Sequence, residues 1–243
     1  MTDLLPVAWP AMLGALLITT GSATLQGTIG FGFSITCVPT LALLDPRLAP
    51  VPQMLVVTPL VFRMAWRERH AIDVKGALWI LVGRFPGAAL GVALVAVATP
   101  RALDFIMASI VLFAVLVMST GFDIPRNKGT QFVAGVTSGV MSYVSAIGGP
   151  ALALIYRDVS GDTLRASLAI VFSVGLFITL GTRVATGQIS WTDVHVAVCL
   201  LPAIGAGLFF SRFLMGRVEG RPLRAAILVV ASFAGVGLLL RSW

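Results

Sequence analysis

The sequence contains little acid for its length. Of its 243 residues, 58% are hydrophobic, 11% are charged and only 10 are Asp or Glu. All ten acids fall between apolar segments or at their ends, so none is expected at mid-membrane. Proton pumps and cation carriers commonly hold their cation with intramembrane Asp or Glu. This distribution argues against a cation as substrate and favours an anion.

Residues that carry enzymatic chemistry are also scarce. The two histidines, His70 and His195, fall near predicted helix ends, and the two cysteines, Cys37 and Cys199, lie in apolar segments without a partner at metal-ligand spacing. A membrane enzyme needs nucleophiles, acids or metal ligands clustered in one cavity. A nucleotide-driven pump needs a phosphate-binding glycine loop, and none occurs. We therefore predict no enzyme activity and no metal or cofactor.

Hydrophobic residues are abundant, and the mean hydropathy is +0.98. This composition is typical of a polytopic, all-α membrane protein. A net charge of +7 would suggest a nucleic-acid partner for a soluble chain, but here Lys and Arg lie in short connections, where they orient membrane spans. We therefore expect lipid as the surroundings and no nucleic acid. Long apolar runs predict helices at residues 7–27, 51–66, 74–98, 103–121, 130–147, 164–187, 194–210 and 222–240.

Two further apolar runs, residues 33–44 and 150–156, are too short to cross a membrane. A spanning helix needs roughly 20 residues to cross about 30 Å of hydrocarbon. We therefore interpret both runs as half-helices, each pairing with the helix before it in a re-entrant hairpin.

Glycine-rich breaks precede both half-helices, at residues 27–34 and 145–150. In lipid, a backbone leaves the helical pattern only where protein buries it or where it lines a cavity, and the free N–H groups of a half-helix attract anions. The alternative is that these glycines only allow close helix packing, which we expect for Gly87, Gly91, Gly205 and Gly207. The candidate substrate-binding residues at the breaks are Gly30, Phe31, Gly32, Phe33, Ser34, Gly148, Gly149, Pro150 and Ala151, with Gln26, Tyr143 and Ser145 just before them.

After the other basic residues are assigned to the connections and helix ends, Arg84 is the one left inside an apolar run. A charge there costs a few kcal/mol on insertion scales, so it is expected to face the protein interior or a watery cavity. We predict that it offers a positive charge to an anionic substrate. The alternative is that Arg84 lies near the helix end and extends to the membrane surface.

An offset of 116 residues lays one half of the sequence over the other. It superposes Gly32 on Gly148 and Pro86 on Pro202. Each half then contains a broken-helix hairpin followed by three transmembrane helices, an odd number of crossings that inverts the second half. We predict two inverted repeats, residues 1–121 and 129–243, joined by residues 122–128, in one compact domain.

The basic residues predict the orientation. The connections at residues 63–75 and 212–224 each carry four basic residues, which places them in the cytoplasm. Counting spans places the basic residues at 126–128 and 157–165 on the same side and the N-terminus outside. No basic stretch precedes the first apolar run, so no cleaved signal peptide is expected.

Several motifs together resemble the sulfite exporter TauE/SafE family of bacterial membrane proteins, also called the four-TMS toluene sulfonate uptake permease family. The first half has residues 30–34 followed by Val38-Pro39, then Ile72-Asp73 and Pro86-Gly87; the second has residues 148–152, Tyr156 and Arg165. The resemblance implies an inverted-repeat transporter of the bacterial inner membrane for small sulfur-containing or organic anions, such as sulfite, sulfoacetate or other sulfonates.

The predicted activity is secondary transport of such an anion by alternating access, in the direction of export. Because the cell interior is negative, expelling a monovalent anion is favoured by about 2.3 kcal/mol per 100 mV and needs no coupling ion. The alternatives are an anion channel, or an uptake carrier for carboxylates or sulfonates. The sequence leaves open which anion is carried, whether protons accompany it, and whether the protein forms a homodimer.

Overall fold

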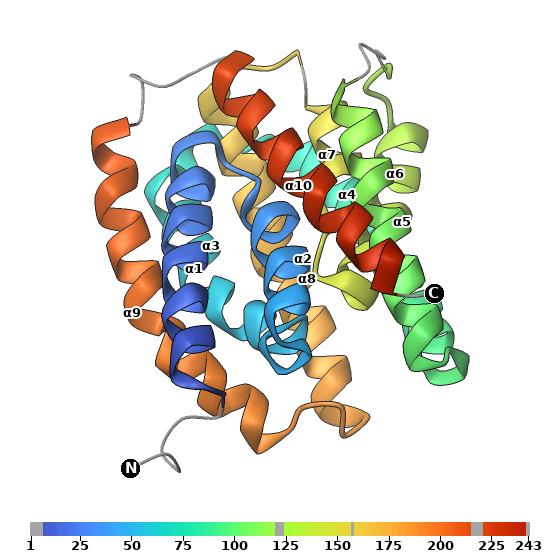
Figure 1. Ribbon diagram of the computed structural model, residues 1–243. Helices are drawn as coiled ribbons and strands as arrows, with labels where there is room; N and C mark the ends of the chain where they lie inside the picture. The colour runs from blue at the N-terminus through green and yellow to red at the C-terminus, as the bar shows by residue number, and fades with distance from the viewer. Residues whose placement is uncertain (1–6, 120–123, 157, 215–220, 242–243) are drawn as a thin grey trace.

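The computed structural model describes residues 7–119, 124–156, 158–214 and 221–241, except the side chains of Pro100 and residues 221–227. The secondary structure in these ranges is helical, which confirms the all-α class (Figure 1). Two short 3-10 turns, Pro46–Leu48 and Arg69–Ala71, flank one of the helices. The α-helices of the described residues are α1 (Trp9–Ile29), α2 (Phe33–Leu44), α3 (Val51–Arg67), α4 (Val74–Val97), α5 (Pro100–Ser119), α6 (Lys128–Ser145), α7 (Gly149–Ile155), α8 (Gly161–Ala185), α9 (Trp191–Leu214) and α10 (Arg221–Arg241).

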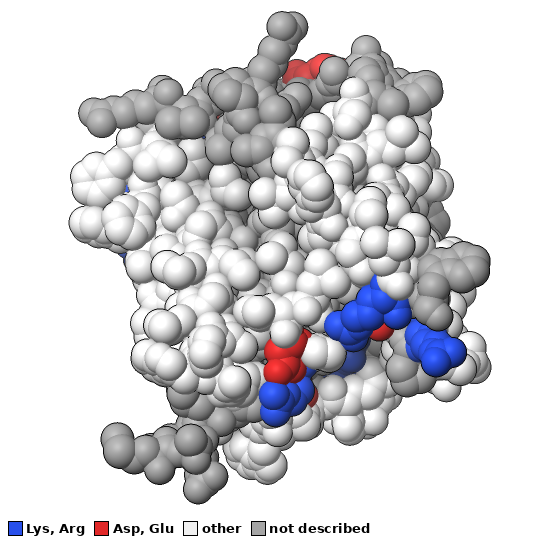
Figure 2. Space-filling view, viewed as in Figure 1, with Lys and Arg blue, Asp and Glu red and all other residues white. Residues whose placement is uncertain are grey.

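Five helical segments of the described chain are long and apolar enough to cross a bilayer. Large apolar side chains such as Phe85, Phe177 and Phe233 are exposed on the outside of the bundle, where a soluble protein would expose few. Residues other than Lys, Arg, Asp and Glu cover most of the described surface on the face drawn in Figure 2. The protein is therefore a polytopic membrane protein. The five segments are Pro46–Arg67, Val74–Val97, Arg101–Ser119, Gly161–Ala185 and Trp191–Leu214.

Both predicted helix breaks are present. Helix α1 ends where Gly30 and Gly32 adopt φ angles of 92° and 114°, and α2 begins one residue later. Glycine adopts this left-handed region without steric cost, so the chain can reverse within three residues. Helix α6 ends at Ala146, whose φ is 60°, and α7 begins at Gly149. The short runs predicted as half-helices form α2, with 12 residues, and α7, with 7.

The first hairpin, α1 and α2, contacts α3, and the second, α6 and α7, contacts α8. Helices α3 and α8 contact each other, α1 packs against α9, and α6 packs against α4. Half-helix α2 also packs against α10 and half-helix α7 against α5, and α5 contacts α10. Each break is thereby held against α3 and α8, next to the middle of the bundle.

Glycine allows the closest of these contacts. A Cβ added at Gly135 of α6 would lie 2.1 Å from the backbone oxygen of Ile80, and one at Gly87 would lie 2.3 Å from that of Val136. Gly91 and Gly207 likewise face a neighbouring helix, so the packing role predicted for Gly87, Gly91 and Gly207 is confirmed. The same prediction is wrong for Gly205, which is exposed and has nothing within 4 Å of its added Cβ.

These contacts predict opposite effects for two matched substitutions. We expect Gly135→Ala to lower the melting temperature in detergent by several degrees, because α4 must move away from α6. Gly205→Ala is the control and is expected to leave it unchanged or higher, since alanine favours a helix by about 1 kcal/mol over glycine. Equal melting temperatures for the two variants would contradict the close approach of α4 and α6.

Connections that were predicted to lie inside meet at one end of the bundle. The Nε atom of Arg165, in α8, lies 3.2 Å from both carboxylate oxygens of Glu68. An ion pair of 3.4 Å joins Arg126 to Asp73, and the Tyr156 hydroxyl lies 3.4 Å from the same carboxylate. The basic segments at residues 63–75, 124–128 and 158–165 therefore share one side of the molecule. The other residues of these predicted connections, 122–123, Arg157 and 215–220, lie outside the described part of the chain.

Candidate anion-binding site

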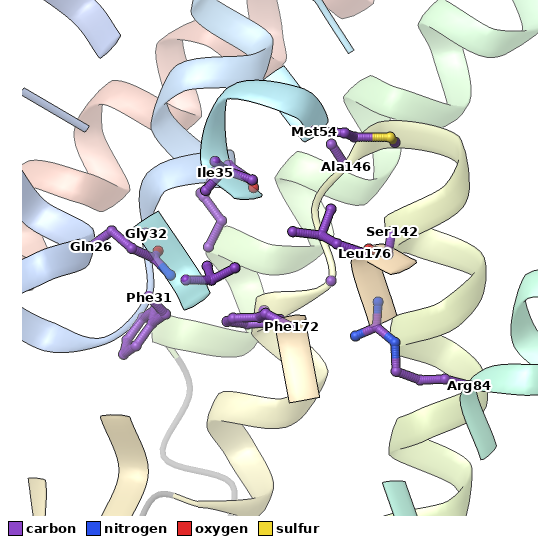
Figure 3. A pocket seen from close by; sticks show the side chains of 15 residues that line it. Gln26, Phe31, Gly32, Ile35, Met54, Arg84, Ser142, Ala146, Phe172 and Leu176 are labelled. Atoms are coloured by element: carbon purple, nitrogen blue, oxygen red, sulfur yellow. The ribbon is translucent and has the colours of Figure 1, made fainter. Parts of the chain in front are cut away.

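A pocket lies between the two breaks, in the middle of the bundle. Its free volume is about 40 Å³. Each water molecule needs about 10–15 Å³ of such free volume, so the pocket has room for roughly three waters. Gln26 and Phe31 approach from one side and Ser142 and Arg84 from the other (Figure 3). The lining residues are Gln26, Phe31, Gly32, Ser34, Ile35, Met54, Val57, Val61, Arg84, Ser142, Ala146, Gly148, Gly149, Phe172 and Leu176.

Arg84 provides the positive charge of this pocket. It lies near the middle of α4, and only 2% of it is exposed, so it does not extend to the membrane surface. Its Nη1 atom donates a hydrogen bond of 3.1 Å to the Ser138 hydroxyl, which donates one of 2.7 Å to the Gly148 carbonyl. Among the described residues, Arg84 forms no ion pair, and its Nε and Nη2 atoms have no hydrogen-bond partner. A buried guanidinium with so few partners is suited to receive an anion.

Gly175 makes room for the Arg84 side chain. A Cβ added at Gly175 of α8 would lie 2.3 Å from Cζ, 2.4 Å from Nε and 2.5 Å from Nη2 of Arg84. The guanidinium group therefore lies directly on the backbone of α8 at Gly175, which stands between pocket residues Phe172 and Leu176 in the sequence. Ser138 and Gly175 together fix where the positive charge of α4 lies in the pocket.

The first break contributes the N-terminal end of α2. The Gln26 side chain spans the turn: its Oε1 accepts a 3.1 Å hydrogen bond from the Phe33 N–H, and its Nε2 donates one of 3.2 Å to the Gly30 carbonyl. Within the described residues, the N–H groups of Ser34 and Ile35 and the Ser34 hydroxyl have no partner. The first turn of α2 thus presents free donors and the positive end of a helix dipole where Ser34 and Ile35 line the pocket.

The second break contributes backbone on the opposite side. Gly148 and Gly149 both line the pocket. A Cβ at Gly148 would lie 2.9 Å from the Ser138 hydroxyl oxygen, so glycine is needed for the hydrogen bond that links this break to Arg84. Pro150 is at the start of α7, where its missing N–H leaves no donor unpaired.

The pocket as a whole combines one buried positive charge, free hydrogen-bond donors and apolar walls, and none of the described residues that line it is acidic. The profile of one family, Sulfite exporter TauE/SafE, matches residues 13–238, which include both breaks and Arg84. The chain belongs to the sulfite exporter TauE/SafE family. It is thus a membrane transporter of anions such as sulfite and not an enzyme, as the sequence predicted. No curated protein and no solved structure matches the chain.

The structure places about half of the predicted substrate-binding residues around the pocket. These are Gln26, Phe31, Gly32, Ser34, Arg84, Gly148 and Gly149. Of the others, Gly30 packs against Arg165, and the Tyr143 hydroxyl donates to Gln188, away from the pocket. The Ser145 hydroxyl bonds the Met141 carbonyl of its own helix. Ala151 lines a separate apolar groove with Phe113 and Leu154, and Phe33 and Pro150 are buried in the packing beside the pocket.

Other residues of the pocket were not predicted. Ser138, which contacts Arg84, and the wall residues Met54, Phe172 and Leu176 lie in ordinary apolar helices. Two serines, Ser142 and Ser145, come just before the second break. Ser142 lines the pocket, whereas Ser145 does not. The sequence contains one signal that could have indicated these two serines. Ser138 and Ser142 are four residues apart and therefore lie on the same face of α6.

Proposed function

We propose that this TauE/SafE protein is a secondary transporter that carries a small sulfur-containing or organic oxyanion, such as sulfite or a sulfonate, by alternating access. The substrate binds between Arg84, the first turn of α2 and the backbone at Gly148 and Gly149. The observation that carries the proposal is the buried Arg84 side chain, which faces the pocket without an acidic partner among the described residues.

Electrostatics support an anion in this position. Removing a charge from water costs several kcal/mol, which an opposite charge with good hydrogen bonds can offset. The Ser138 hydroxyl compensates the Arg84 charge only in part, because it is neutral and contacts one of the three guanidinium nitrogens. An oxyanion accepts from the free Nε and Nη2 atoms and from the uncapped N–H groups of α2, and such charge-assisted bonds are the strong ones.

The size and lining of the pocket favour a small substrate that has an apolar part. Its volume of about 40 Å³ suits a compact oxyanion. Phe31 and Phe172 form an apolar wall, against which the carbon of a sulfonate or a short carboxylate can pack. This combination favours sulfite and small sulfonates over bulky organic anions.

Alternating access is supported by reciprocal packing of the two halves. Helix α1 contacts α9 as α6 contacts α4, and α2 contacts α10 as α7 contacts α5. The 116-residue offset converts each of these contacts of the first half into the matching contact of the second. Two inverted repeats require this relation, and we assign them to residues 1–121 and 129–243, joined by residues 122–128. Helices α1 and α6 also run in opposite directions (Figure 1). Tilting one half against the other would open the pocket to each side in turn.

We further propose export across the bacterial inner membrane, with the N-terminus outside. The end of the molecule that contains Arg165 and Arg126 is then cytoplasmic. Outward movement of a monovalent anion is driven by about 2.3 kcal/mol per 100 mV, without a coupling ion.

A binding screen of the purified protein tests the substrate class. We expect sulfite and small sulfonates such as sulfoacetate to raise the melting temperature, since a ligand that binds only the folded state stabilises it. Sulfate, thiosulfate, taurine and simple carboxylates are the comparison set. A response to carboxylates alone would contradict the sulfur-containing substrate and favour the uptake carrier.

Flux in proteoliposomes separates a carrier from a channel. Saturable sulfite flux with counterflow is expected from alternating access. Flux of millions of ions per second without counterflow would replace the carrier by an anion channel.

A further inference from the structure

Three arginine side chains are buried among the described residues, and they differ in what neutralises them. Arg165 is neutralised by acids, Glu68 and Asp162. Arg84 and Arg183, 2% and 5% exposed, form no ion pair within this part of the chain. Arg84 is explained by the proposed substrate site. Arg183 is a second buried cation without an acid.

Arg183 lies on the same route through the protein as Arg84. On α8, Arg183 follows Gly175, against which Arg84 packs, by eight residues, about 12 Å along the helix. On α4, Gly91 follows Arg84 by seven residues, and a Cβ at Gly91 would lie 2.6 Å from Cβ of Tyr143. The Arg183 guanidinium lies over the Tyr143 ring, with Cζ 4.6 Å from its centroid. Two helices therefore place Arg183 and Tyr143 about two turns beyond Arg84, away from Arg165. Ser142 of α6 and Ala146 at the end of this helix, on either side of Tyr143 in the sequence, line the same pocket as Arg84.

The contacts of Arg183 leave part of its binding capacity unused. Its Nη2 donates to the Tyr143 carbonyl at 2.5 Å, and its Nη1 donates to Oε1 of Gln188 at 3.1 Å. The buried Nε atom has no hydrogen-bond partner in the part of the chain that the structure describes. Nearby Asp193 instead accepts hydrogen bonds from the N–H and hydroxyl of Ser190 at the start of α9. An unpartnered buried donor on a cation costs free energy unless a ligand accepts from it.

We propose that Arg183, with Tyr143 and Gln188, forms a second anion station, which the substrate occupies on its way between the Arg84 pocket and the end of the bundle where α8 joins α9. The proposal rests on the proposed transport function and takes the same class of ligand, a small oxyanion. Gln188 and the Tyr143 hydroxyl share a 3.1 Å hydrogen bond, so Gln188 covers the station and moves aside when an anion accepts from Arg183. With two positively charged sites in succession, the anion does not have to cross a long stretch of protein without a positive charge nearby.

The test measures sulfite flux for Arg183→Gln in right-side-out and inside-out vesicles at zero membrane potential. From the face at the α8–α9 connection, KM is expected to rise about tenfold, the equivalent of about 1.4 kcal/mol, with Vmax unchanged. At zero membrane potential, net flux vanishes when the sulfite concentrations on the two sides are equal, so Vmax/KM must be the same for both directions. Vmax/KM therefore also falls about tenfold for transport from the other face, but there the fall is in Vmax and KM is unchanged. Arg183→Lys keeps the charge and is expected to raise KM only about threefold. It also carries the test if the glutamine variant does not fold.

The control is Arg47→Gln, which removes an exposed arginine paired with Asp45 outside the site, and its kinetics are expected to match wild type. If Arg183 is only a structural clamp, both Arg183 variants lower the melting temperature with an unchanged KM from both faces, which overturns the station alone. A wild-type protein that moves no sulfite, sulfonate or carboxylate overturns the transport proposal and the station together.

Discussion

Replacing Arg84 with glutamine is expected to lower sulfite flux at least 100-fold without lowering the stability of the protein. Two charge-assisted hydrogen bonds to the anion are lost, from the Nε and Nη2 atoms that have no partner among the described residues. At about 1.5 kcal/mol or more each, they account for about two factors of ten in affinity. Flux in proteoliposomes and the sulfite-dependent rise in melting temperature measure the loss.

The stability half of this prediction distinguishes a binding residue from a structural one. Removing one member of a buried ion pair is strongly destabilising because the other charge is left unpaired. Arg84 has no such partner among the described residues, so Arg84→Gln removes a desolvated charge and leaves none behind. We expect the melting temperature without anion to stay the same or rise.

Two further variants define the outcome. Arg84→Lys keeps the charge but loses the fork of parallel donors, and an intermediate flux is expected. Arg47→Gln, on the surface, is expected to change neither flux nor stability. Unchanged sulfite flux in Arg84→Gln would remove Arg84 from the binding site, and an unfolded variant would make its role structural.

Local signals in the sequence were sufficient to predict the helices and both breaks. Hydropathy over about 20 residues separates spanning helices from half-helices. Glycine at residues 30 and 32 indicates left-handed backbone, and the structure has both there. These features depend on residues close together in the chain, so no tertiary information was needed.

The walls of the pocket could not be predicted in the same way. Phe172 and Leu176 line it, whereas Phe177 on the same helix is 65% exposed. In a membrane protein both the lipid-facing side and the interior are apolar, so hydrophobicity does not tell one from the other. Gly205 and Gly207 differ in the same manner, since only the second contacts another helix. Which face of a helix points inward depends on partners far away in the sequence.

Gly175 is the clearest example, and it yields the second prediction with a large effect. Gly175→Ala is expected to lower sulfite flux at least tenfold while the helix becomes slightly more stable. The new methyl group would take the position of the Arg84 guanidinium, from which an added Cβ is separated by only 2.3–2.5 Å. The guanidinium is the end of a flexible side chain, so it moves away and α8 stays in place. Flux and melting temperature measure the two effects.

Gly181→Ala is the matched control on α8, because an added Cβ there has nothing within 4 Å. Both substitutions give the helix the same gain in propensity, about 1 kcal/mol, so only the contact with Arg84 differs between them. The double variant Gly175→Ala with Arg84→Lys tests the mechanism, since the slimmer ammonium group can pass the new methyl. If Gly175 acts by positioning Arg84, the two substitutions are not additive, and the double variant transports at least as well as Gly175→Ala alone. Strictly additive losses would mean that Gly175 affects transport through some other contact.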